Sequence, residues 1–483
     1  MYLGIDVGTS SVKTAVLDEA GALLASSSAP LAVSRPQLLW SEQNPQDWWQ
    51  ATTDAVLQLA PDTRRAVRAI GLSGQMHGAT VLDAQDRVLR PAILWNDGRS
   101  GEQCTELEAA VPDLASITGN RAMAGFTAPK LLWLRAHEPQ LFAQIATVLL
   151  PKDYVRLCMT GDKASDLSDS AGTLWLDVAQ RSWSPTVLEA TGLTLAHMPR
   201  LFEGNACTGH LRGEIAEAWG MRRVAVAAGG GDNAAGAIGA GVINPGDAFL
   251  SLGTSGVLFF ADDRYRPNAR EGVHTFCHAL PGRWHQMAVI LSAASCVQWA
   301  AELTGLDSAA ALLALAEKRA QPAQTEIFLP YLSGERTPHN DPHAQGVFLG
   351  LTHATDTGAL AQAVLEGVAF AFRDGLDALL NCGTRIESIS VIGGGSRSLY
   401  WGRLLSTVLQ RRLVYRDGAA VGPAFGAARL ALLALQDQTV DSACTPPPVL
   451  EVVEPEAALA EHYAGRVEKY RGVYQALRAS FRT

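Results

Sequence analysis

Short apolar runs alternate with brief polar turns at the start of the chain. Residues 2–7, 12–17 and 23–27 each have the length and the apolar content of a buried strand. The turns between them, at residues 8–11 and 18–21, are too short for a crossover connection. The three strands are therefore expected to pair as an antiparallel meander.

Helical and strand patterns alternate after this meander. Residues 44–59 predict a helix, and residues 66–73 predict a strand that ends at a glycine. In the second half, residues 358–382 have apolar side chains at helical spacing, and residues 388–392 form another apolar strand. A polar-faced helix is expected over residues 457–481. Alternation of this kind predicts an α/β fold.

The centre of the chain carries one carboxylate in an unusual setting. An alternating Val/Ala run at residues 224–228 predicts a buried strand, and the glycines 229–231 end it. A helix of small residues is expected to begin at Asp232. Asp is a good helix N-cap, and on this stretch alone capping is the favoured interpretation. The alternative is that Asp232 faces a ligand, which the small neighbouring residues would admit.

Composition and charge narrow the functional class. With 483 residues the chain is expected to form two domains or more. Its net charge of −9 argues against a nucleic-acid binder, and no apolar run is long enough to span a membrane. The first residues lack the basic and apolar parts of a secretory leader, so we expect a cytoplasmic protein. The seven cysteines are scattered, which fits reduced thiols better than disulfides.

One group of metal-binding residue types occurs at His274, Cys277, His278 and His285. Its spacing matches no standard zinc pattern, and the segment alternates like a strand with a Pro-Gly turn. Packing and hydrogen bonding are therefore the favoured interpretation.

The first turn has the composition of a phosphate-binding loop. Gly8, Thr9 and Ser10 offer backbone N–H groups and hydroxyls to phosphate oxygens. Asp6 precedes this turn by two residues and is placed to bind Mg²⁺, directly or through water. For one isolated turn, a plain hairpin with a capping Asp would be the simpler interpretation.

The same turn recurs in the second half, where Gly253 and Thr254 begin a Gly-Thr-Ser triplet between two apolar runs. The two triplets are 245 positions apart, close to half the chain. A match in both residues and strand context predicts a duplicated fold whose halves face each other across a cleft. We expect the domains to cover residues 1–241 and 242–483.

A glycine-bounded loop follows the strand predicted over residues 66–73. It contains Gln75, Met76 and His77, at a strand end where open α/β sheets bind ligands. Gln75 and His77 can hydrogen-bond hydroxyl groups, and Met76 can lie against a carbon skeleton. A turn with a satisfied His is an equally good interpretation on local grounds.

A second glycine loop repeats the glycine triplet of the Asp232 turn without its carboxylate. It follows the strand at residues 388–392 and contains Gly394, Gly395 and Ser396. Glycines allow close approach to a flat purine and its ribose. This loop is therefore expected to bind adenosine.

Together these loops describe ATP-dependent phosphoryl transfer to a hydroxyl group. The two phosphate turns and Asp6 suit a triphosphate with Mg²⁺, and Asp232 is the expected acceptor of the hydroxyl proton. No Gly-Lys-Ser or Gly-Lys-Thr turn is present, which excludes a P-loop kinase.

The chain also resembles the FGGY family of carbohydrate kinases nearly from end to end. The motifs that carry the resemblance are at residues 4–10, 74–78, 229–233, 251–255 and 393–395. The resemblance implies two actin-like (ribonuclease H-like) ATPase domains in tandem, with the catalytic cleft between them. It also implies ATP and Mg²⁺ as cofactors, with Asp6 supporting the metal and its nucleotide.

Within this family, the loop 74–78 and the stretch 93–99 favour members that act on D-xylulose. The resemblance then implies phosphorylation at O5, with Asp232 as the general base, to give D-xylulose 5-phosphate and ADP. The implied sugar contacts are Gln75, Met76, His77 and Asn233.

Two alternatives remain at this point. An actin-type or heat-shock-type ATPase has the same pair of phosphate turns, but that class does not explain why the loop 75–77 should converge with Asp232. A sister kinase acting on ribulose, glycerol or gluconate would share the motifs and differ in a few pocket contacts. The expected partners are a sugar and ATP, with no nucleic acid and no membrane, and the sequence is compatible with a homodimer.

Overall fold

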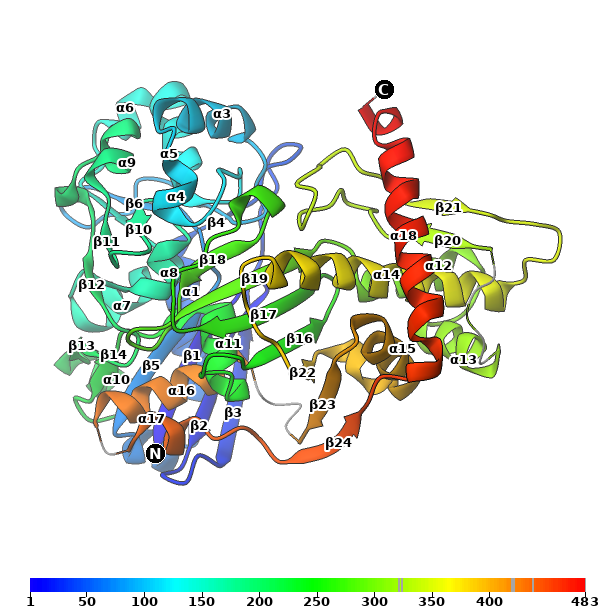
Figure 1. Cartoon of the computed structure of the whole chain (residues 1–483). Coiled ribbons are helices and arrows are strands. Elements are labelled where there is room, and N and C mark those ends of the chain that lie inside the picture. The colour runs from blue at the N-terminus through cyan, green and yellow to red at the C-terminus, as the bar shows by residue number, and fades with distance from the viewer. Residues whose placement is uncertain (320–321, 323–324, 418–421, 437, 483) are drawn as a thin grey trace.

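Two seven-stranded sheets, one from each half of the chain, form the frame of the molecule (Figure 1). The structure is a computed structural model, and it describes residues 1–319, 322, 325–417, 422–436 and 438–482. Both sheets contain parallel and antiparallel pairs, and helices pack against them. The α/β fold class expected from the alternating patterns is confirmed.

The first sheet joins the predicted meander to a parallel pair of strands. Its order is β13-β14-β5-β1-β2-β3, with β15 added beside β5. The strands are β1 Tyr2–Val7, β2 Ser11–Leu17, β3 Leu23–Pro30, β5 Ala69–Gly74, β13 Cys207–His210, β14 Ala225–Ala227 and β15 Gly230–Gly231. Because β1 is parallel to β5, the turn after β1 and the loop after β5 leave the sheet at the same edge.

The second sheet repeats this plan. Its order is β18-β19-β17-β16-β22-β23-β24. The strands are β16 Ala248–Leu252, β17 Gly256–Asp262, β18 His274–Cys277, β19 Trp284–Ile290, β22 Ser388–Ile392, β23 Arg412–Arg416 and β24 Val449–Val453. β16 is antiparallel to β17 and parallel to β22, just as β1 is to β2 and β5. The two Gly-Thr-Ser turns therefore occupy equivalent positions, and the predicted duplication of an actin-like domain is confirmed.

Helices α11 (Asp232–Ala240) and α16 (Pro423–Ala434) cross between the two halves. α16 comes from the second half but packs on β1 and β5 of the first sheet. A Cβ atom at Gly4 or Gly71 would lie 1.8 or 1.9 Å from a carbonyl oxygen of this helix, so the contact requires glycine. α11 packs against α16, and its Ala237 shares a buried cluster with β16 and β17 of the second sheet.

The packing of α16 on the first sheet concerns the predicted division of the chain into two domains. The division into residues 1–241 and 242–483 stays a prediction. The structure adds that a helix from the second range covers the sheet of the first.

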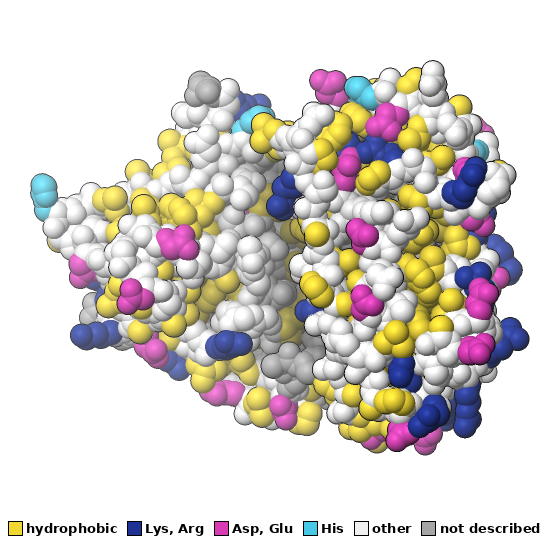
Figure 2. Space-filling model, turned by 180° about the vertical axis from the view of Figure 1, so that it is seen from behind, with side chains coloured by type: hydrophobic (Ala, Val, Ile, Leu, Met, Phe, Trp, Pro, Cys, Tyr) yellow, Lys and Arg dark blue, Asp and Glu magenta, His cyan; other side chains and the backbone are white. Residues whose placement is uncertain are grey.

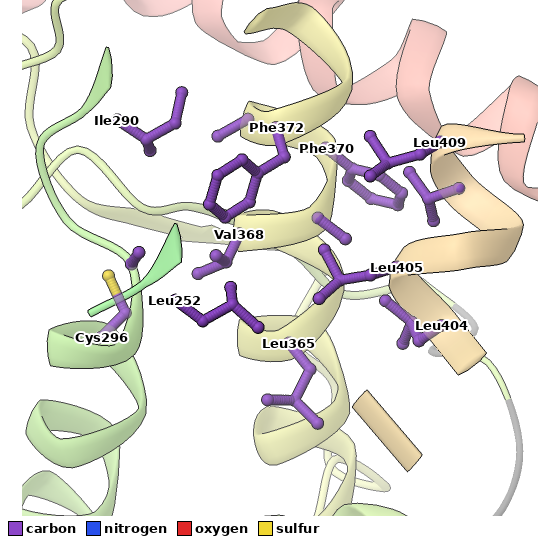
Figure 3. Close-up of a cluster of buried hydrophobic side chains, with 14 of the residues drawn as sticks. Leu252, Ile290, Cys296, Leu365, Val368, Phe370, Phe372, Leu404, Leu405 and Leu409 are labelled. Atoms are coloured by element: carbon purple, nitrogen blue, oxygen red, sulfur yellow. The ribbon is translucent and has the colours of Figure 1, made fainter. Parts of the chain in front are cut away.

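The second half is built around α14 (Thr357–Leu380), the long helix predicted from apolar spacing. Most of its residues are buried, and Leu365, Val368 and Phe372 project from it into a cluster drawn in Figure 3. The side chains around them are Leu252 and Ile290 from the sheet, Cys296 from α12 (Ala294–Leu303), and Leu404, Leu405 and Leu409 from α15 (Leu399–Leu409). This core fixes the ends of β16 and β19 beside the cleft.

The remaining elements surround this frame. The other helices are α1 Pro45–Gln58, α2 Pro61–Ala66, α3 Gly101–Ala110, α4 Leu114–Thr118, α5 Thr127–His137, α6 Pro139–Phe142, α7 Pro151–Thr160, α8 Leu167–Ala171, α9 Pro185–Ala190, α10 Gly213–Trp219, α13 Ala309–Arg319, α17 Val440–Ala443 and α18 Ala460–Leu477. The other strands are β4 Glu42–Gln43, β6 Thr80–Leu82, β7 Ala92–Ile93, β8 Thr147–Leu149, β9 Ala164–Asp166, β10 Leu176–Asp177, β11 Ser182–Trp183, β12 Arg200–Phe202, β20 Ile327–Leu329 and β21 Val347–Leu349. In the described part of the chain, no helix combines the length and the hydrophobicity needed to cross a bilayer. All seven cysteines are free thiols.

Candidate active site

A cavity of about 260 Å³ lies between the two halves of the molecule. In the view opposite to Figure 1, a groove separates the halves at the surface (Figure 2). The walls of the cavity include Met76, His77, Trp95, Asp232 and Asn233 from the first half, and Ser255, His274 and Arg336 from the second. Four of the residues predicted from the sequence, Met76, His77, Asp232 and Asn233, therefore meet in one place.

Asp232 is the first residue of α11, and Gly231 takes the N-cap position. The capping role considered for Asp232 is therefore wrong, since its side chain makes no cap bond. Its Oδ1 instead accepts hydrogen bonds from the backbone N–H of Asn233 at 2.7 Å and from the side-chain amide of Asn233 at 3.0 Å. Burial raises the pKa of Asp232 to about 6, against the lowering effect of these bonds. Such a carboxylate is ionised at neutral pH and can accept a proton.

Asp6 lies near the end of β1 and is only 7 % exposed. Burial raises the pKa of Asp6 to about 7, and the negative charge of Asp232 adds to the rise. In the described part of the chain, Asp6 Oδ1 has no hydrogen-bond partner. Mg²⁺ takes oxygen ligands of this type, so an unpaired carboxylate oxygen beside a second carboxylate fits the predicted metal site.

Two buried amides support the first phosphate turn from behind. Thr9 Oγ1 donates to Gln75 Oε1 at 2.9 Å and accepts from the indole N–H of Trp95 at 3.0 Å. Gln75 Nε2 donates to Gln43 Oε1 at 2.8 Å, and Gln43 Nε2 donates to the Thr9 carbonyl at 2.8 Å. Gly8 and Thr9 remain partly exposed, and Ser10 is exposed. The structure thus places Gln75 behind the turn, bonded to Thr9 and Gln43, and not among the residues that line the cavity.

His77 presents a neutral acceptor in the cavity wall. Its Nδ1 lies 2.6 Å from the carbonyl oxygen of Gly172. A carbonyl can only accept, so Nδ1 carries the hydrogen and Nε2 is left as an acceptor. Burial lowers the pKa of His77 to about 3, so the ring is uncharged at neutral pH. The buried Lys130 donates to the His77 carbonyl at 2.8 Å and holds this residue, whose φ is 69°.

Met76 connects the loop after β5 to the Asp232 turn. A Cβ atom at Gly231 would lie 3.0 Å from the Met76 sulfur, so the glycine lets the two segments touch. Gly229 has a φ of 85°, and a Cβ atom there would lie 1.9 Å from the Leu72 carbonyl oxygen. The glycines before Asp232 therefore allow the turn to rest on β5, which brings Asp232 beside Met76.

The second phosphate turn presents its hydroxyl groups at the cleft. Thr254 and Ser255 are exposed, and Ser255 also lines the cavity. The carbonyls of Gly253 and Thr254 accept hydrogen bonds from backbone N–H groups at the start of α12. A Cβ atom at Gly256 would lie 2.3 Å from the ring of Phe372, so this glycine seats the turn on the core of Figure 3.

A second cavity, of about 310 Å³, lies beside the loop after β22. Gly394 and Ser396 line it, together with Arg416 of β23. A Cβ atom at Gly394 would meet nothing within 4 Å, so this face of the loop is open. Gly395 faces the core instead, since its Cβ would lie 2.9 Å from that of Leu252. The open glycine face has the shape expected for a flat base.

Comparisons with known proteins agree with this geometry. Residues 1–239 match the amino-terminal domain of the FGGY family of carbohydrate kinases, and residues 248–435 match its carboxy-terminal domain. The chain belongs to the FGGY family of carbohydrate kinases. It is 54 % identical to the xylulose kinase of Escherichia coli K12 over 479 residues, which are 99 % of both chains.

Solved structures of FGGY relatives have the same fold. A structure named as a xyloylose kinase from Brucella ovis superposes with a TM-score of 0.96 at 50 % identity, covering 99 % of both chains. The xylulose kinase from Rhodospirillum rubrum gives 0.92 at 28 % identity over the full length of both chains. Membership of a kinase family also decides against an actin-type or heat-shock-type ATPase.

Several residues of this FGGY kinase site were not identified from the sequence. Arg336 and His274 line the cavity from the second half, and Phe126 lines it from the first. His274 belongs to the histidine group that resembled a metal site, but its Nδ1 pairs with Asn120 Oδ1 at 2.8 Å. In that group, His285 stacks on Phe259 with ring centres 4.5 Å apart. These residues come from separate chain segments of ordinary composition, so no local pattern marks them.

Proposed function

We propose that this protein transfers the γ-phosphoryl group of ATP to O5 of D-xylulose, giving D-xylulose 5-phosphate and ADP. The observation that carries the proposal is the similarity to xylulose kinases over the whole chain, at up to 54 % identity among the relatives described above. The site supports it because Asp232 and Ser255 of the second phosphate turn line one cavity. Asp6 is close enough to Asp232 to feel its charge, and Thr9 of the first turn is bonded to Trp95 of the cavity wall.

In the proposed reaction Asp232 acts as general base. The proton of the O5 hydroxyl passes to the Asp232 carboxylate while O5 bonds to the γ-phosphorus and ADP leaves. The raised pKa of Asp232 supports this role, because a carboxylate with a pKa of about 6 is a better proton acceptor than one near 4 and is still ionised at neutral pH. Asn233 donates twice to Asp232 and holds the carboxylate in the cavity wall.

The nucleotide is proposed to lie across the two turns. Gly8, Thr9 and Ser10 on one side, and Gly253 and Thr254 on the other, offer backbone N–H groups and hydroxyls to its phosphates. Mg²⁺ would be held beside Asp6, where it would neutralise phosphate charge. The loop with Gly394, Gly395 and Ser396 is proposed to receive adenosine. This arrangement is supported by the equivalent positions of the two turns in their sheets.

The sugar is proposed to bind against Met76, His77 and Asn233. Met76 offers an apolar contact, and His77 Nε2 offers an acceptor for a hydroxyl hydrogen. Gln75 acts on the reaction through Thr9, because its amide is used in holding the turn.

A panel of sugars tests the substrate. We expect D-xylulose to stimulate ADP release far more than ribulose, glycerol or gluconate, measured at equal concentrations with a coupled ADP assay. A larger response to any of these competitors would overturn the assignment to D-xylulose and leave a sister kinase of the same family.

The Asp232→Ala variant tests the base. Loss of a general base typically lowers kcat about a hundredfold or more, and we expect at least this loss with the fold retained in circular dichroism. Near-normal turnover of the variant would remove Asp232 from the mechanism.

A further inference from the structure

Arg336 brings a guanidinium group into the cavity wall opposite the loop that carries His77. It lies between β20 and β21, in a loop that sequence motifs did not single out. In the described part of the chain, its one side-chain hydrogen bond runs from Nη1 to His274 Nε2 at 3.4 Å, and no carboxylate forms an ion pair with it. A guanidinium has five N–H donors, so most of them remain available to a ligand in the cavity.

A chain of hydrogen bonds from the first half fixes the position of this group. The side-chain amide of Asn120 donates to the carbonyls of Thr118 and Thr275, which leaves its Oδ1 as an acceptor. His274 Nδ1 lies 2.8 Å from that oxygen and must donate to it, so His274 Nε2 is an acceptor. Arg336 donates to this nitrogen. Asn120 and His274 together therefore aim the guanidinium at the cavity.

The backbone of the Arg336 loop is held as firmly. Glu335 Oε1 accepts from the N–H of Leu291, directly after β19. Thr337 is bonded twice to Val289, through its own N–H at 3.2 Å and its hydroxyl oxygen at 3.0 Å. A side chain that is anchored on both sides in this way can recognise a ligand with little loss of conformational entropy.

This part of the cavity offers donors at one point and an acceptor at another. Arg336 supplies the donors, and His77 Nε2 supplies the acceptor. The same cavity is also lined by Phe276, Met287 and Val289, whose side chains donate no hydrogen bond and, apart from the weakly accepting Met287 sulfur, accept none. A hydroxyketone matches this pattern, because its carbonyl oxygen accepts and its hydroxyl donates.

We propose that Arg336 binds the carbonyl oxygen of the ketose and selects ketoses over the corresponding polyols. This inference rests on the proposed function, since it assigns the far end of the same substrate. A polyol has a hydroxyl where the ketose has its carbonyl, and the hydrogen of that hydroxyl needs a hydrogen-bond acceptor. Arg336 only donates, and the apolar walls offer no acceptor stronger than the Met287 sulfur, so the hydrogen of the polyol would be poorly paired there.

The variants Arg336→Met and Arg336→Lys test the assignment, with D-xylulose and xylitol as substrates. Met keeps the length of the side chain without donors, and Lys keeps the charge without the fork of donors. For Arg336→Met we expect KM for D-xylulose to rise about 10- to 100-fold, the range for losing a hydrogen bond to a charged group, with kcat within about threefold. The kcat/KM for xylitol should change less than about threefold, so the preference for the ketose falls. Arg336→Lys should lie between wild type and Arg336→Met.

Arg264→Met is the matched control, because Arg264 lies in the same half with its side chain 74 % exposed. Arg264→Met should leave kcat and KM unchanged for both D-xylulose and xylitol. Isothermal titration with D-xylulose in the absence of ATP gives a second readout, in which Arg336→Met should weaken binding by the same factor as KM. Equal losses on D-xylulose and xylitol, or a change confined to the KM for ATP, would overturn the proposal.

The sugar panel and the Arg336 variants give separate outcomes. If the wild-type protein prefers a sugar other than D-xylulose, the proposed function fails in the sugar panel alone. The role of Arg336 is then read from the preferred ketose and its polyol, and an unchanged ratio in Arg336→Met would overturn it there as well.

Discussion

At the scale of single residues, Asp6 and Asp232 are carboxylates held in surroundings unfavourable to charge. Burial raises the pKa of Asp6 to about 7 and that of Asp232 to about 6, from the ordinary value of 3.8 for an aspartic acid. The ionised forms that the proposed chemistry needs therefore cost folding free energy. Such a cost is expected at sites arranged for a metal and a charged ligand.

Asp232→Asn is expected to raise the free energy of unfolding at pH 8. An acid whose pKa is raised on folding destabilises the native state above its unfolded pKa of 3.8, and this cost is complete above about pH 6. Asp232 is partly exposed, so we expect a gain on the order of 1 kcal/mol. At pH 4 the native carboxyl is already protonated and the variant should gain little. Urea unfolding at the two pH values measures the difference.

Asp62→Asn provides the control for this measurement. The Asp62 side chain is 91 % exposed, so its removal should change stability by less than about 0.5 kcal/mol at either pH. A gain for Asp232→Asn that is as large at pH 4 as at pH 8 would contradict the assignment of the raised pKa.

The sequence identified those site residues that stand in short local motifs. Asp6, Met76, His77 and Asp232 were found because a glycine or a strand end marks each of them. Gln75 stands in the same glycine-bounded loop at a strand end, where its amide predicts a hydrogen bond to a sugar hydroxyl. The parallel pairing of β1 and β5 brings the first phosphate turn next to it, and Thr9 takes up its amide. Only long-range pairing decides between these roles.

At the scale of elements, glycines set how closely α16 approaches its neighbours. A Cβ atom at Gly426 would lie 1.7 Å from the carbonyl oxygen of Ala235 on α11. Gly4 and Gly71 serve the same purpose on the sheet side of α16. The two halves of the molecule are therefore joined by backbone packed against backbone, with no side chain able to adjust between them.

Gly426→Val is expected to destabilise the protein by more than about 2 kcal/mol. Overpacking of a buried contact typically costs 1–3 kcal/mol, and here the added atoms meet rigid backbone. Gly236→Ala on α11 is the matched control, since a Cβ atom there meets nothing within 4 Å and alanine favours the helix. In urea unfolding, the free energy of unfolding should be lower than that of wild type for Gly426→Val and higher for Gly236→Ala. Equal stability of Gly426→Val and wild type would show that α11 and α16 do not pack this closely.

A buried charge cluster supports the Asp232 turn from below. Lys152 Nζ lies 2.6 Å from a carboxylate oxygen of Asp153, 2.8 Å from one of Asp166 and 3.3 Å from one of Asp169. Ser168 Oγ donates to Asp166 at 2.5 Å and accepts from the N–H of Gly231 at 3.2 Å. The cluster thus reaches the residue directly before Asp232.

Only part of this cluster can be predicted from the sequence. Asp166, in a segment of Ser and Asp residues typical of helix caps, caps α8 through the N–H groups of Ser168 and Asp169. Asp169 is fully buried beside Lys152 instead. The ammonium group comes from α7, and no pattern within either segment indicates that the two meet.

Lys152→Met is expected to destabilise the fold by about 3–5 kcal/mol, because it leaves buried carboxylates without their cation. Lys163→Met is the control, since the Lys163 side chain is 37 % exposed and forms an exposed pair with Asp86. Burial raises the pKa of Asp169 well above its usual value, so the double variant Lys152→Met/Asp169→Asn should lose less stability than Lys152→Met alone. Thermal unfolding of the set measures these differences, and no improvement in the double variant would contradict the coupling.

At the scale of the whole molecule, the repeat was visible in the sequence and the crossing of the halves was not. Two Gly-Thr-Ser triplets in matching strand contexts were sufficient to predict two similar domains. Nothing in the apolar pattern of α16 indicates which sheet it covers, because its buried face would suit either. The composition of the cavity is equally hard to predict, because Arg336 comes from the second half of the chain and Met76, His77 and Asp232 come from the first.

A cavity with walls from both halves should respond to its ligands by closing. Asp232 and His77 lie on one side of it, and Ser255 and Arg336 lie on the other. A sugar that contacts both sides favours the closed arrangement, and closure excludes the water that would otherwise compete for the phosphoryl group.

We expect D-xylulose with a non-hydrolysable ATP analogue to reduce the radius of gyration in small-angle X-ray scattering, and neither ligand alone to do so fully. Without sugar, ATP hydrolysis should be at least about a hundredfold slower than sugar phosphorylation. Arg336→Met should weaken the contraction at a fixed sugar concentration and recover it at high concentration. An unchanged radius with both ligands bound would mean that the cleft is already closed.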